Sequence, residues 1–324
     1  MLEQEEVAGI PLILSREVRA ERRLQGLGLP PHLAARLSRN LSAYLLLVPA
    51  LVFLGVVFVY PMIELIPMSL ERIAIGQTKW VGLSNFSYLL FSDRIARTAA
   101  LNNLKLLTGI PIILVLAVVI AVCLYERVRG TGFYQTVVLL PYLLSIPVVG
   151  LVMSSFLTLD GALNSILRSL GLDALALDWL GSAKLALWSV LAVIIWRELG
   201  MGVSFFLAQL LTLDEELFDA AKVDGASWLQ QVLYVSIPQL RGIATFYAIY
   251  LVITLFSWTF GYVFVMTNGG PGFATTVLEL AIYRYAIDKR MPSMAAALSL
   301  LLFIGMLGFV FAQFRLRQGS AEET

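Results

Sequence analysis

Two charged side chains in the middle of an apolar segment are the first candidates for chemistry. Arg197 and Glu198 are neighbours within the apolar segment 185–211. A charge inside a membrane helix costs about 2.5–3.5 kcal/mol on insertion scales unless it faces a polar cavity or a partner. Consecutive helix residues point to different sides, so each is expected to need its own environment. Either one or both face a translocation pathway or another subunit, or they form an ion pair between helices that fixes packing.

Aromatic and hydroxyl side chains in two further apolar segments could together bind a polar solute. Aromatic rings cover the apolar faces of such a solute, and hydroxyl groups exchange hydrogen bonds with it in a partly wet cavity. Pro141 and Pro147 could open a kink that exposes backbone carbonyls to a cavity. The alternative is that these aromatic residues pack against other helices or form the interfacial belt. The residues expected to line the pathway, besides Arg197 and Glu198, are Tyr142, Ser145, Ser257, Trp258, Thr259 and Tyr262.

The polar stretch 212–231 has the signals of two short helices. Thr212 and Glu215 have the spacing of a capping box at a helix start. Gly225 is a natural helix stop, because it takes positive φ without a Cβ clash. Ser227 with Gln230 can cap a second helix. These signals predict a helical hairpin with a sharp turn at 224–225, lying along the membrane surface.

The first helix of this hairpin is expected to display Leu217, Phe218 and Ala221 along one side, at helical spacing. Small Ala220 and Ala221 would allow close approach by another molecule. A cytoplasmic loop of any transporter could also form such a hairpin, so the helical pattern alone leaves a docking role open.

Several kinds of chemistry are missing. The sequence contains no Gly-Lys dipeptide, so it has no Walker A loop for ATP. One histidine and one cysteine exclude a zinc site and an internal disulfide. A formal net charge of +1 argues against nucleic-acid binding. We therefore do not expect an enzyme, and a glycosyl-transfer enzyme would need paired carboxylates that the chain does not provide.

The composition is typical of a polytopic membrane protein. Of 324 residues, 59% are hydrophobic and 14% are charged, and the mean hydropathy is +0.84. A helix needs about 20 consecutive apolar residues to cross the hydrocarbon core. Six segments meet this length, so we predict an all-α membrane protein with six transmembrane helices. The segments are 43–65, 104–125, 133–157, 185–211, 243–267 and 293–314.

The segments outside these spans define the expected topology. Residues 1–40 form an N-terminal tail rich in arginine, 41–316 the membrane domain and 317–324 a C-terminal tail. Slightly more basic residues lie on the inner side if the N-terminus is cytoplasmic, and six spans then place both termini there. The first apolar segment is expected to be an uncleaved anchor. A shorter segment, 274–287, is expected to be an interfacial helix.

The polar loop resembles the EAA loop of permease subunits of binding-protein-dependent ABC importers. Asp219-Ala220-Ala221 is followed by Gly225 and then by Val235-Ser236-Ile237-Pro238, with the spacing of that motif. The sequence has Asp in place of Glu, Val in place of Ile and Ile in place of Leu. The resemblance implies the type I ABC importer permease fold, with 212–240 as the coupling loop between helices 4 and 5.

Other segments are similar to the carbohydrate branch of this family, of the maltose, glycerol-phosphate and oligosaccharide type. Leu139-Leu140-Pro141-Tyr142 resembles its F-L-P-Y element, and Asp178-Trp179-Leu180 resembles its outer-loop W-L element. The segment 267–271, Thr-Asn-Gly-Gly-Pro, resembles the G-G-P element of one of the two permease types in sugar importers. The similarity covers about 41–316.

The resemblance implies both a function and a set of partners. The chain would form half of a pathway for a sugar, an oligosaccharide or a sugar-like solute in the cytoplasmic membrane of a bacterium or archaeon. Its partners would be a second homologous permease, two ABC ATPase subunits that hold ATP and Mg²⁺, an extracytoplasmic solute-binding protein and the lipid bilayer. No cofactor is expected in this chain. The alternative is an ion-coupled secondary transporter that uses Arg197 or Glu198. The expected ATPase-coupling residues are Leu217, Phe218, Asp219, Ala220, Ala221, Asp224 and Gly225.

Overall fold

A computed structural model describes residues 46–74, 77–125 and 130–321. The expected tail 1–40 and the last three residues of the expected tail 317–324 lie outside the described residues. The chain divides into two compact units, Met1–Leu65 and Ile66–Thr324. In the first unit, a helix begins at Leu46 and continues through a π-helical turn, η1 (Gly55–Val59), into α3 (Tyr60–Leu70).

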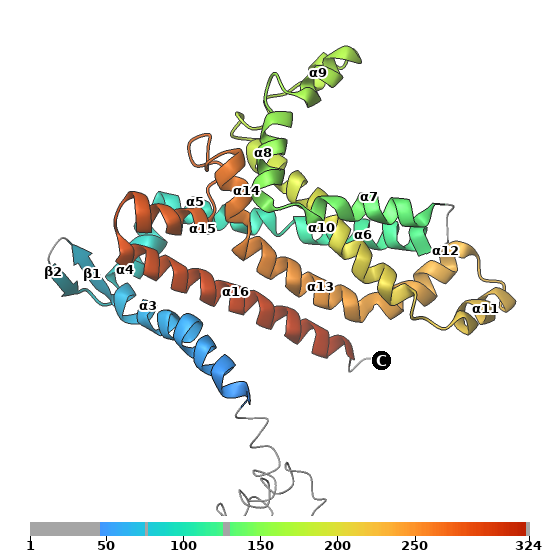
Figure 1. Cartoon of the computed structure of the whole chain (residues 1–324), viewed down its shortest axis with the longest axis horizontal. Helices are drawn as coiled ribbons and strands as arrows, with labels where there is room; N and C mark the ends of the chain where they lie inside the picture. Colours follow the sequence, from blue (N-terminus) through green and yellow to red (C-terminus); the bar gives the residue numbers. More distant parts are fainter. Residues whose placement is uncertain (1–45, 75–76, 126–129, 322–324) are drawn as a thin grey trace, which may run out of the picture. The chain divides into compact units, whose positions relative to one another are not determined.

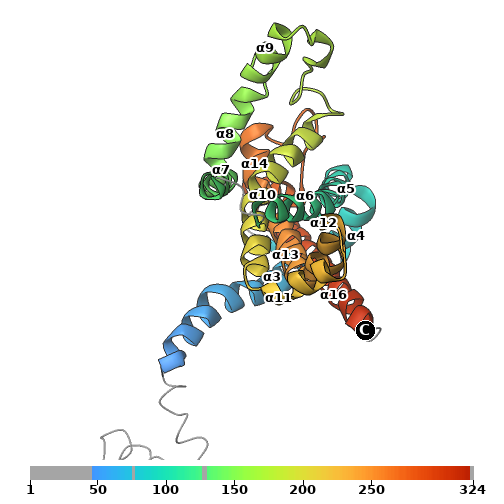
Figure 2. The same ribbon diagram turned by 90° about the vertical axis from the view of Figure 1, so that its right-hand side faces the viewer.

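The second unit consists almost entirely of helices (Figures 1 and 2). A β-hairpin, which the sequence did not predict, follows α3: β1 and β2 pair antiparallel with Glu71 opposite Trp80. In chain order the elements are β1 (Glu71–Ala74), β2 (Gln77–Trp80), α4 (Ser84–Ser87), η2 (Tyr88–Ser92), α5 (Arg94–Leu106), α6 (Gly109–Tyr125), α7 (Thr131–Leu143), α8 (Ile146–Phe156), α9 (Ala162–Ser169), η3 (Asp173–Leu175), α10 (Ala186–Leu210), α11 (Glu215–Val223), α12 (Trp228–Gln231), η4 (Val232–Ser236), α13 (Ile237–Ser257), α14 (Thr259–Met266), α15 (Leu278–Tyr283), η5 (Arg284–Asp288) and α16 (Pro292–Ala321).

The apolar spans agree in number with the six expected ones, but their boundaries differ. Five helices among the described residues are long and apolar enough to cross a membrane, and a bent pair, α7 with α8, gives the sixth. The first extends to Leu70 and the second begins at Arg94. The expected span 243–267 is a longer helix, 228–257, followed by the separate α14. The expected interfacial segment forms α15 and η5.

The expected continuous span 133–157 is broken. Its two halves, α7 and α8, meet at 98°. Pro147 has no N–H to donate to the carbonyl four residues before it, and at the start of α8 this missing donor has no cost. Ser145 accordingly leaves the helical region with ψ of 144°. The proline therefore ends one helix and begins another in a new direction.

The core of the second unit is centred on α10, which packs along α6, α7 and α13 (Figure 1). Two glycines of α10 allow this close packing. A Cβ on Gly200 would lie 2.5 Å from the carbonyl oxygen of Val138 in α7. A Cβ on Gly202 would lie 2.6 Å from the ring of Tyr247 in α13. The centre of α10 is thus held close to the backbone of α7 and to a ring of α13.

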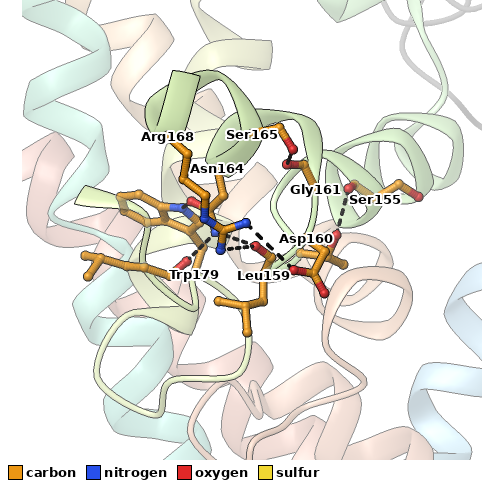
Figure 3. A network of polar contacts seen from close by, with 10 residues as sticks. Ser155, Leu159, Asp160, Gly161, Asn164, Ser165, Arg168 and Trp179 are labelled. Carbon is orange, nitrogen blue, oxygen red and sulfur yellow. Dashed lines mark hydrogen bonds and ion pairs between the residues drawn. The ribbon is translucent and has the colours of Figure 1, made fainter. Parts of the chain in front are cut away.

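The helix pair α8 and α9 extends away from this core in both views (Figures 1 and 2). The loop after α9 returns to α10 and folds on itself around Asn164, which is fully buried. Figure 3 shows the indole N–H of Trp179 donating to Asn164 Oδ1 at 2.9 Å. The Asn164 amide in turn donates to the backbone carbonyls of Leu159 and Leu177. The W-L element of the sequence therefore anchors this loop.

Candidate functional site

The loop between α10 and α13 forms the hairpin that the sequence predicted. The helix α11 ends in a Schellman motif: the Ala226 N–H donates to the Ala221 carbonyl at 2.9 Å, and the Gly225 N–H donates to the Lys222 carbonyl at 3.0 Å. Gly225 has φ of +79°, as its expected role requires. A Cβ at Gly225 would meet nothing within 4 Å, so backbone conformation and not space demands glycine here.

The two helix starts in this loop have different outcomes. The capping box of Ser227 and Gln230 is present, with the Ser227 N–H donating to Gln230 Oε1 at 2.7 Å. The capping box expected at Thr212 is wrong. Asp214 is the N-cap residue of α11, and the Thr212 hydroxyl instead donates to the Gln209 carbonyl at 2.7 Å. Thr212 therefore belongs to the turn that follows α10 and does not start α11.

Only part of the expected face of α11 is free. The ring of Phe218 lies 5.8 Å from that of Tyr125, at the end of α6, so Phe218 packs against its own chain. Ala221 is half-buried, whereas Leu217 is 43% exposed. The α6 contact therefore fixes the orientation of α11.

The remaining expected coupling residues, Asp219, Ala220, Asp224 and Gly225, are exposed. Asp219 forms an ion pair with Lys222 at 3.0 Å. Sequence reasoning missed Val223, which is 87% exposed at the last turn of α11. The sequence signal for Val223 is its position as an apolar residue between the charged Lys222 and Asp224, shortly before the helix stop at Gly225. The structure thus adds an apolar contact point at the tip of the hairpin.

The second candidate site lies at the break between α7 and α8. The carbonyls of Tyr142 and Leu144 have no intrahelical donor beyond the break, and the Arg197 guanidinium of α10 donates to both. Arg197 Nη2 lies 3.0 Å from the Tyr142 oxygen and 3.2 Å from the Leu144 oxygen. The same guanidinium lies over the Tyr142 ring, 4.8 Å from its centroid. The expected kink is present, and its carbonyls accept hydrogen bonds from Arg197.

Arg197 and Glu198 do not occupy separate environments, so that expectation is wrong. Arg197 Nη1 lies 2.7 Å from Glu198 Oε1, and the two side chains are 12% and 1% exposed. The long arginine side chain bends back to its neighbour, which the directions of the Cβ atoms did not reveal. The ion pair lies within one helix and not between helices. The second carboxylate oxygen, Glu198 Oε2, is buried without a hydrogen-bond partner in the described part of the chain.

Three tyrosines surround this ion pair, and two of them were not predicted. The Tyr142 and Tyr250 hydroxyls lie 2.9 Å apart, and the Tyr247 hydroxyl donates to the Glu198 carbonyl at 2.6 Å. Tyr247 and Tyr250 stack with ring centroids 5.7 Å apart. The sequence signal for this pair is the spacing of three residues between Tyr247 and Tyr250, which places both on one side of α13. The predicted Tyr262 is buried in α14, with Arg197 and Glu198 among its polar neighbours.

Four predicted pathway residues are not joined to this cluster by the described contacts. Ser145 lies exposed at the break, and Ser257 and Trp258 lie exposed where α13 ends. The Thr259 hydroxyl is buried and donates to the Leu255 carbonyl at 2.8 Å, across the junction between α13 and α14. These hydroxyls and the indole therefore mark helix breaks, whereas the polar cluster consists of Arg197, Glu198 and tyrosines.

Two cavities lie along the broken span, one beside α7 and the other beside α8. The first, of about 400 Å³, lies between α7 and α10 and includes Gln135, Thr136, Gly200 and Ser204. The second, of about 420 Å³, includes Ser154, Ser155 and Thr158 near the end of α8, together with residues of the loop before α10 and of the G-G-P segment. The arginine-bound break separates the α7 residues of one cavity from the α8 residues of the other.

The G-G-P segment forms a tightly bonded turn after α14. The Thr275 hydroxyl donates to the Gly270 carbonyl at 2.8 Å, and the Thr276 hydroxyl donates to the Gly269 carbonyl at 3.1 Å. Gly269 has φ of +79°, and a Cβ there would lie 2.7 Å from Thr276 Oγ1. The amide of Asn102 in α5 donates to the Thr276 carbonyl at 2.9 Å. The turn is thereby fixed to α5.

One carboxyl group near this turn has a strongly altered acidity. Glu279 is in the first turn of α15, outside the apolar spans, and its Oε2 accepts from the Asn103 amide at 3.2 Å. Its Oε1 is buried with no partner among the described residues. Burial raises the pKa of Glu279 to about 7, against the smaller lowering effects of its own backbone N–H and of Asn103. No cluster of three or more metal-ligating acidic, His or Cys side chains occurs within the described ranges.

Comparisons with known proteins identify the family of this chain. Residues 81–317 match the family described as "Binding-protein-dependent transport system inner membrane component". The chain is 31% identical to the probable ABC transporter permease protein YurN of Bacillus subtilis, over 86% of this chain and 97% of that protein. It is 28% identical to the lactose transport system permease protein LacF of Rhizobium radiobacter, over 84% of this chain and 93% of that protein.

A solved structure is also similar to this chain. It belongs to a bacterial ABC transporter involved in the import of the acidic polysaccharide alginate. The TM-score is 0.76 at 23% identity, covering 89% of this chain and 98% of that one. At this level of identity the likeness is one of fold.

Proposed function

The chain belongs to the family of binding-protein-dependent transport system inner membrane components, and from this membership we propose how its two sites work together. It is a multi-pass membrane permease subunit of an ABC importer for sugars. Relatives named for lactose and sn-glycerol-3-phosphate transport support a sugar or a sugar-like solute. In our proposal the chain forms half of a pathway that a second, homologous permease completes.

The coupling proposal rests on the hairpin between α10 and α13. Its exposed tip, with Ala220 and Val223 around a glycine-dependent turn, would be gripped by one of two ATPase subunits on the cytoplasmic side. Because only residues 211–214 separate α10 from α11, a displacement of the hairpin pulls directly on α10. ATP and Mg²⁺ would be held by those partner subunits, and both termini of this chain would lie on their side of the membrane.

The same helix α10 holds Arg197, so it links the coupling loop to the break in the pathway. Thirteen residues separate Arg197 from Leu210, which corresponds to about 20 Å of helix. We propose that Arg197 closes the passage between the two cavities by binding the Tyr142 and Leu144 carbonyls. Movement of α10 would draw the guanidinium away from the break and so open the passage between the two cavities. The solute would come from an extracytoplasmic binding protein that docks near the G-G-P turn.

The test is affinity purification of the chain from native membranes in mild detergent, with partners identified by mass spectrometry. We expect a second permease and a Walker A-containing ATPase. A variant with Ala221→Glu and Gly225→Asp should lose the ATPase and keep the second permease. The matched control Ala162→Glu, an exposed alanine at the start of α9, should retain both. An ATPase that binds the hairpin variant as well as the control would contradict the coupling proposal.

The alternative, an ion-coupled transporter that works alone, receives no support from the relatives. In addition, one oxygen of Glu198 is bound to Arg197, which leaves this carboxylate a poor carrier for a free ion. Collapse of the proton gradient with ATP maintained discriminates the two. Uptake should continue under these conditions.

A further inference from the structure

An apolar slot on the side of the second unit has the features of a lipid site. It has a volume of about 260 Å³ and lies between α5, α13, α15 and α16. Leu89, Phe256 and Leu298 form a buried floor, and Leu90 and Leu104 are exposed at its rim, 49% and 46% respectively. Arg97 is the single charged residue of its lining. We propose that this slot binds one acyl chain of an anionic phospholipid, with the phosphate at Arg97.

The length of the slot fits one leaflet of a bilayer. Its α16 residues extend from Leu298 to Phe309, which corresponds to about 16 Å of helix. Half of a hydrocarbon core about 30 Å thick is about 15 Å. Arg97 belongs to the first turns of α5, at the end of an apolar span, where a headgroup would lie. At the other end the slot reaches the ring pair of Phe256 and Phe309, whose centroids are 5.7 Å apart.

The charges at the mouth favour an anion. Within the described chain the Arg97 guanidinium has no carboxylate partner, and its Nε donates to the Asp93 carbonyl at 3.4 Å. The Asp93 carboxylate is already engaged, since it accepts from the Ile95 N–H at 2.7 Å and from the Tyr285 hydroxyl. Lys289 Nζ lies over the Tyr285 ring, 4.2 Å from its centroid. Arg97 and Lys289 thus lie around one carboxylate whose oxygens already accept hydrogen bonds, and this excess of cations suits a phosphate.

The narrowness of the slot argues against a protein helix as its occupant. A helix is about 10 Å across, and 16 Å of it would need several times the volume available. An apolar cavity of this size excludes water and accepts apolar molecules. Gly305 of α16 lines the slot, and a Cβ there would meet nothing within 4 Å. A side chain at Gly305 can therefore fill the slot without disturbing the packing around it.

The test uses the full chain purified with its partner subunits in nanodiscs. The probes are phosphatidylglycerol and phosphatidylcholine, each with a photoactivatable acyl chain, and mass spectrometry locates the labelled peptides. We expect phosphatidylglycerol to label α5 and α16 peptides of the slot. Gly305→Leu should remove this label, whereas Gly308→Leu, an equally open glycine outside the slot, should keep it. Arg97→Gln should reduce the label about fivefold, the effect of one basic residue near a membrane surface, and Arg94→Gln should not.

Three results would overturn the proposal. The first is equal labelling of the slot by the two lipids. The second is an equal effect of Gly305→Leu and Gly308→Leu, which would show that the label does not come from the slot. The third is capture of a protein segment by a photoreactive residue at Leu301, whether residues 46–65 of this chain or a partner helix. Comparable yield and monodispersity of all variants establish that each one is folded.

Discussion

Replacement of Arg197 by methionine is the most informative perturbation of the polar cluster. Methionine keeps much of the volume of the arginine stem but removes all hydrogen-bond donors. Glu198, whose side chain is 1% exposed, then loses the partner at 2.7 Å. The Tyr142 and Leu144 carbonyls lose donors at 3.0 and 3.2 Å. The variant therefore separates the chemistry of the guanidinium from its bulk.

The expected cost is large because the pair is buried. Removal of one partner of a buried ion pair costs about 3–5 kcal/mol, since the other charge remains uncompensated. Addition of Glu198→Gln removes that charge, so the double variant should recover more than half of the lost stability. The carbonyls at the break still lack donors in the double variant. We therefore expect solute uptake to remain strongly reduced after stability has been restored.

The assay combines thermal unfolding of the purified assembly in detergent with ATP-driven uptake in proteoliposomes. A stability of Arg197→Met within about 0.5 kcal/mol of the unmodified protein, the range of ordinary surface changes, would refute the burial argument. A double variant as unstable as the single one would refute the assignment of the cost to Glu198. A stable double variant with full uptake would refute the role of Arg197 at the break.

Three further predictions concern other positions. Gly225→Pro should abolish uptake at normal abundance of the protein, because proline cannot adopt φ of +79°. Normal uptake by this variant in a transport assay would exclude the proposal that the hairpin transmits movement to α10. Glu279, with its pKa raised from 4.5 to about 7, should favour the folded state fully below pH 4.5 and lose that contribution as the pH rises through 7. This contribution of Glu279 to the free energy of unfolding amounts to about 3 kcal/mol. Glu279→Gln should therefore flatten the pH dependence of thermal unfolding. An unchanged pH profile would mean that Glu279 does not cause this pH dependence. Gly269→Ala should destabilise the G-G-P turn by about 1–3 kcal/mol, because a positive φ and a contact at 2.7 Å with Thr276 Oγ1 both oppose a Cβ. Gly272→Ala, with positive φ but no neighbour within 4 Å, should cost less in the same unfolding measurement.

Local signals in the sequence predicted the two helices of the hairpin well, but they predicted the packing of the hairpin against α6 only in part. Gly225 and the Ser227–Gln230 cap act within a few residues, so spacing alone identifies them. The capping box at Thr212 failed because the Thr212 hydroxyl donates back to the Gln209 carbonyl at the end of α10, and α11 begins only after Asp214. The packing of Phe218 on Tyr125 depends on a segment far away in the chain, which no local pattern reports.

The polar cluster was beyond sequence reasoning for the same reason. Prolines indicated a kink between Pro141 and Pro147, but not its angle of 98°. Arg197 meets the Tyr142 carbonyl across 55 residues of sequence, and this contact exists only because α10 packs along α7. Tyr247 resembled an ordinary packing residue of an apolar span, and only the fold brings its hydroxyl to the Glu198 carbonyl.

Photo-cross-linking from Ala220 in the native assembly tests the central claim most directly, because this exposed residue lies on the outer side of α11. A photoreactive amino acid at Ala220 should capture a Walker A-containing ATPase, and ATP should change the yield of that product. The same amino acid at Leu170, at the end of α9, should not capture the ATPase. An Ala220 product without an ATPase, or the same partner at both positions, would contradict the assignment of this hairpin as the site of coupling.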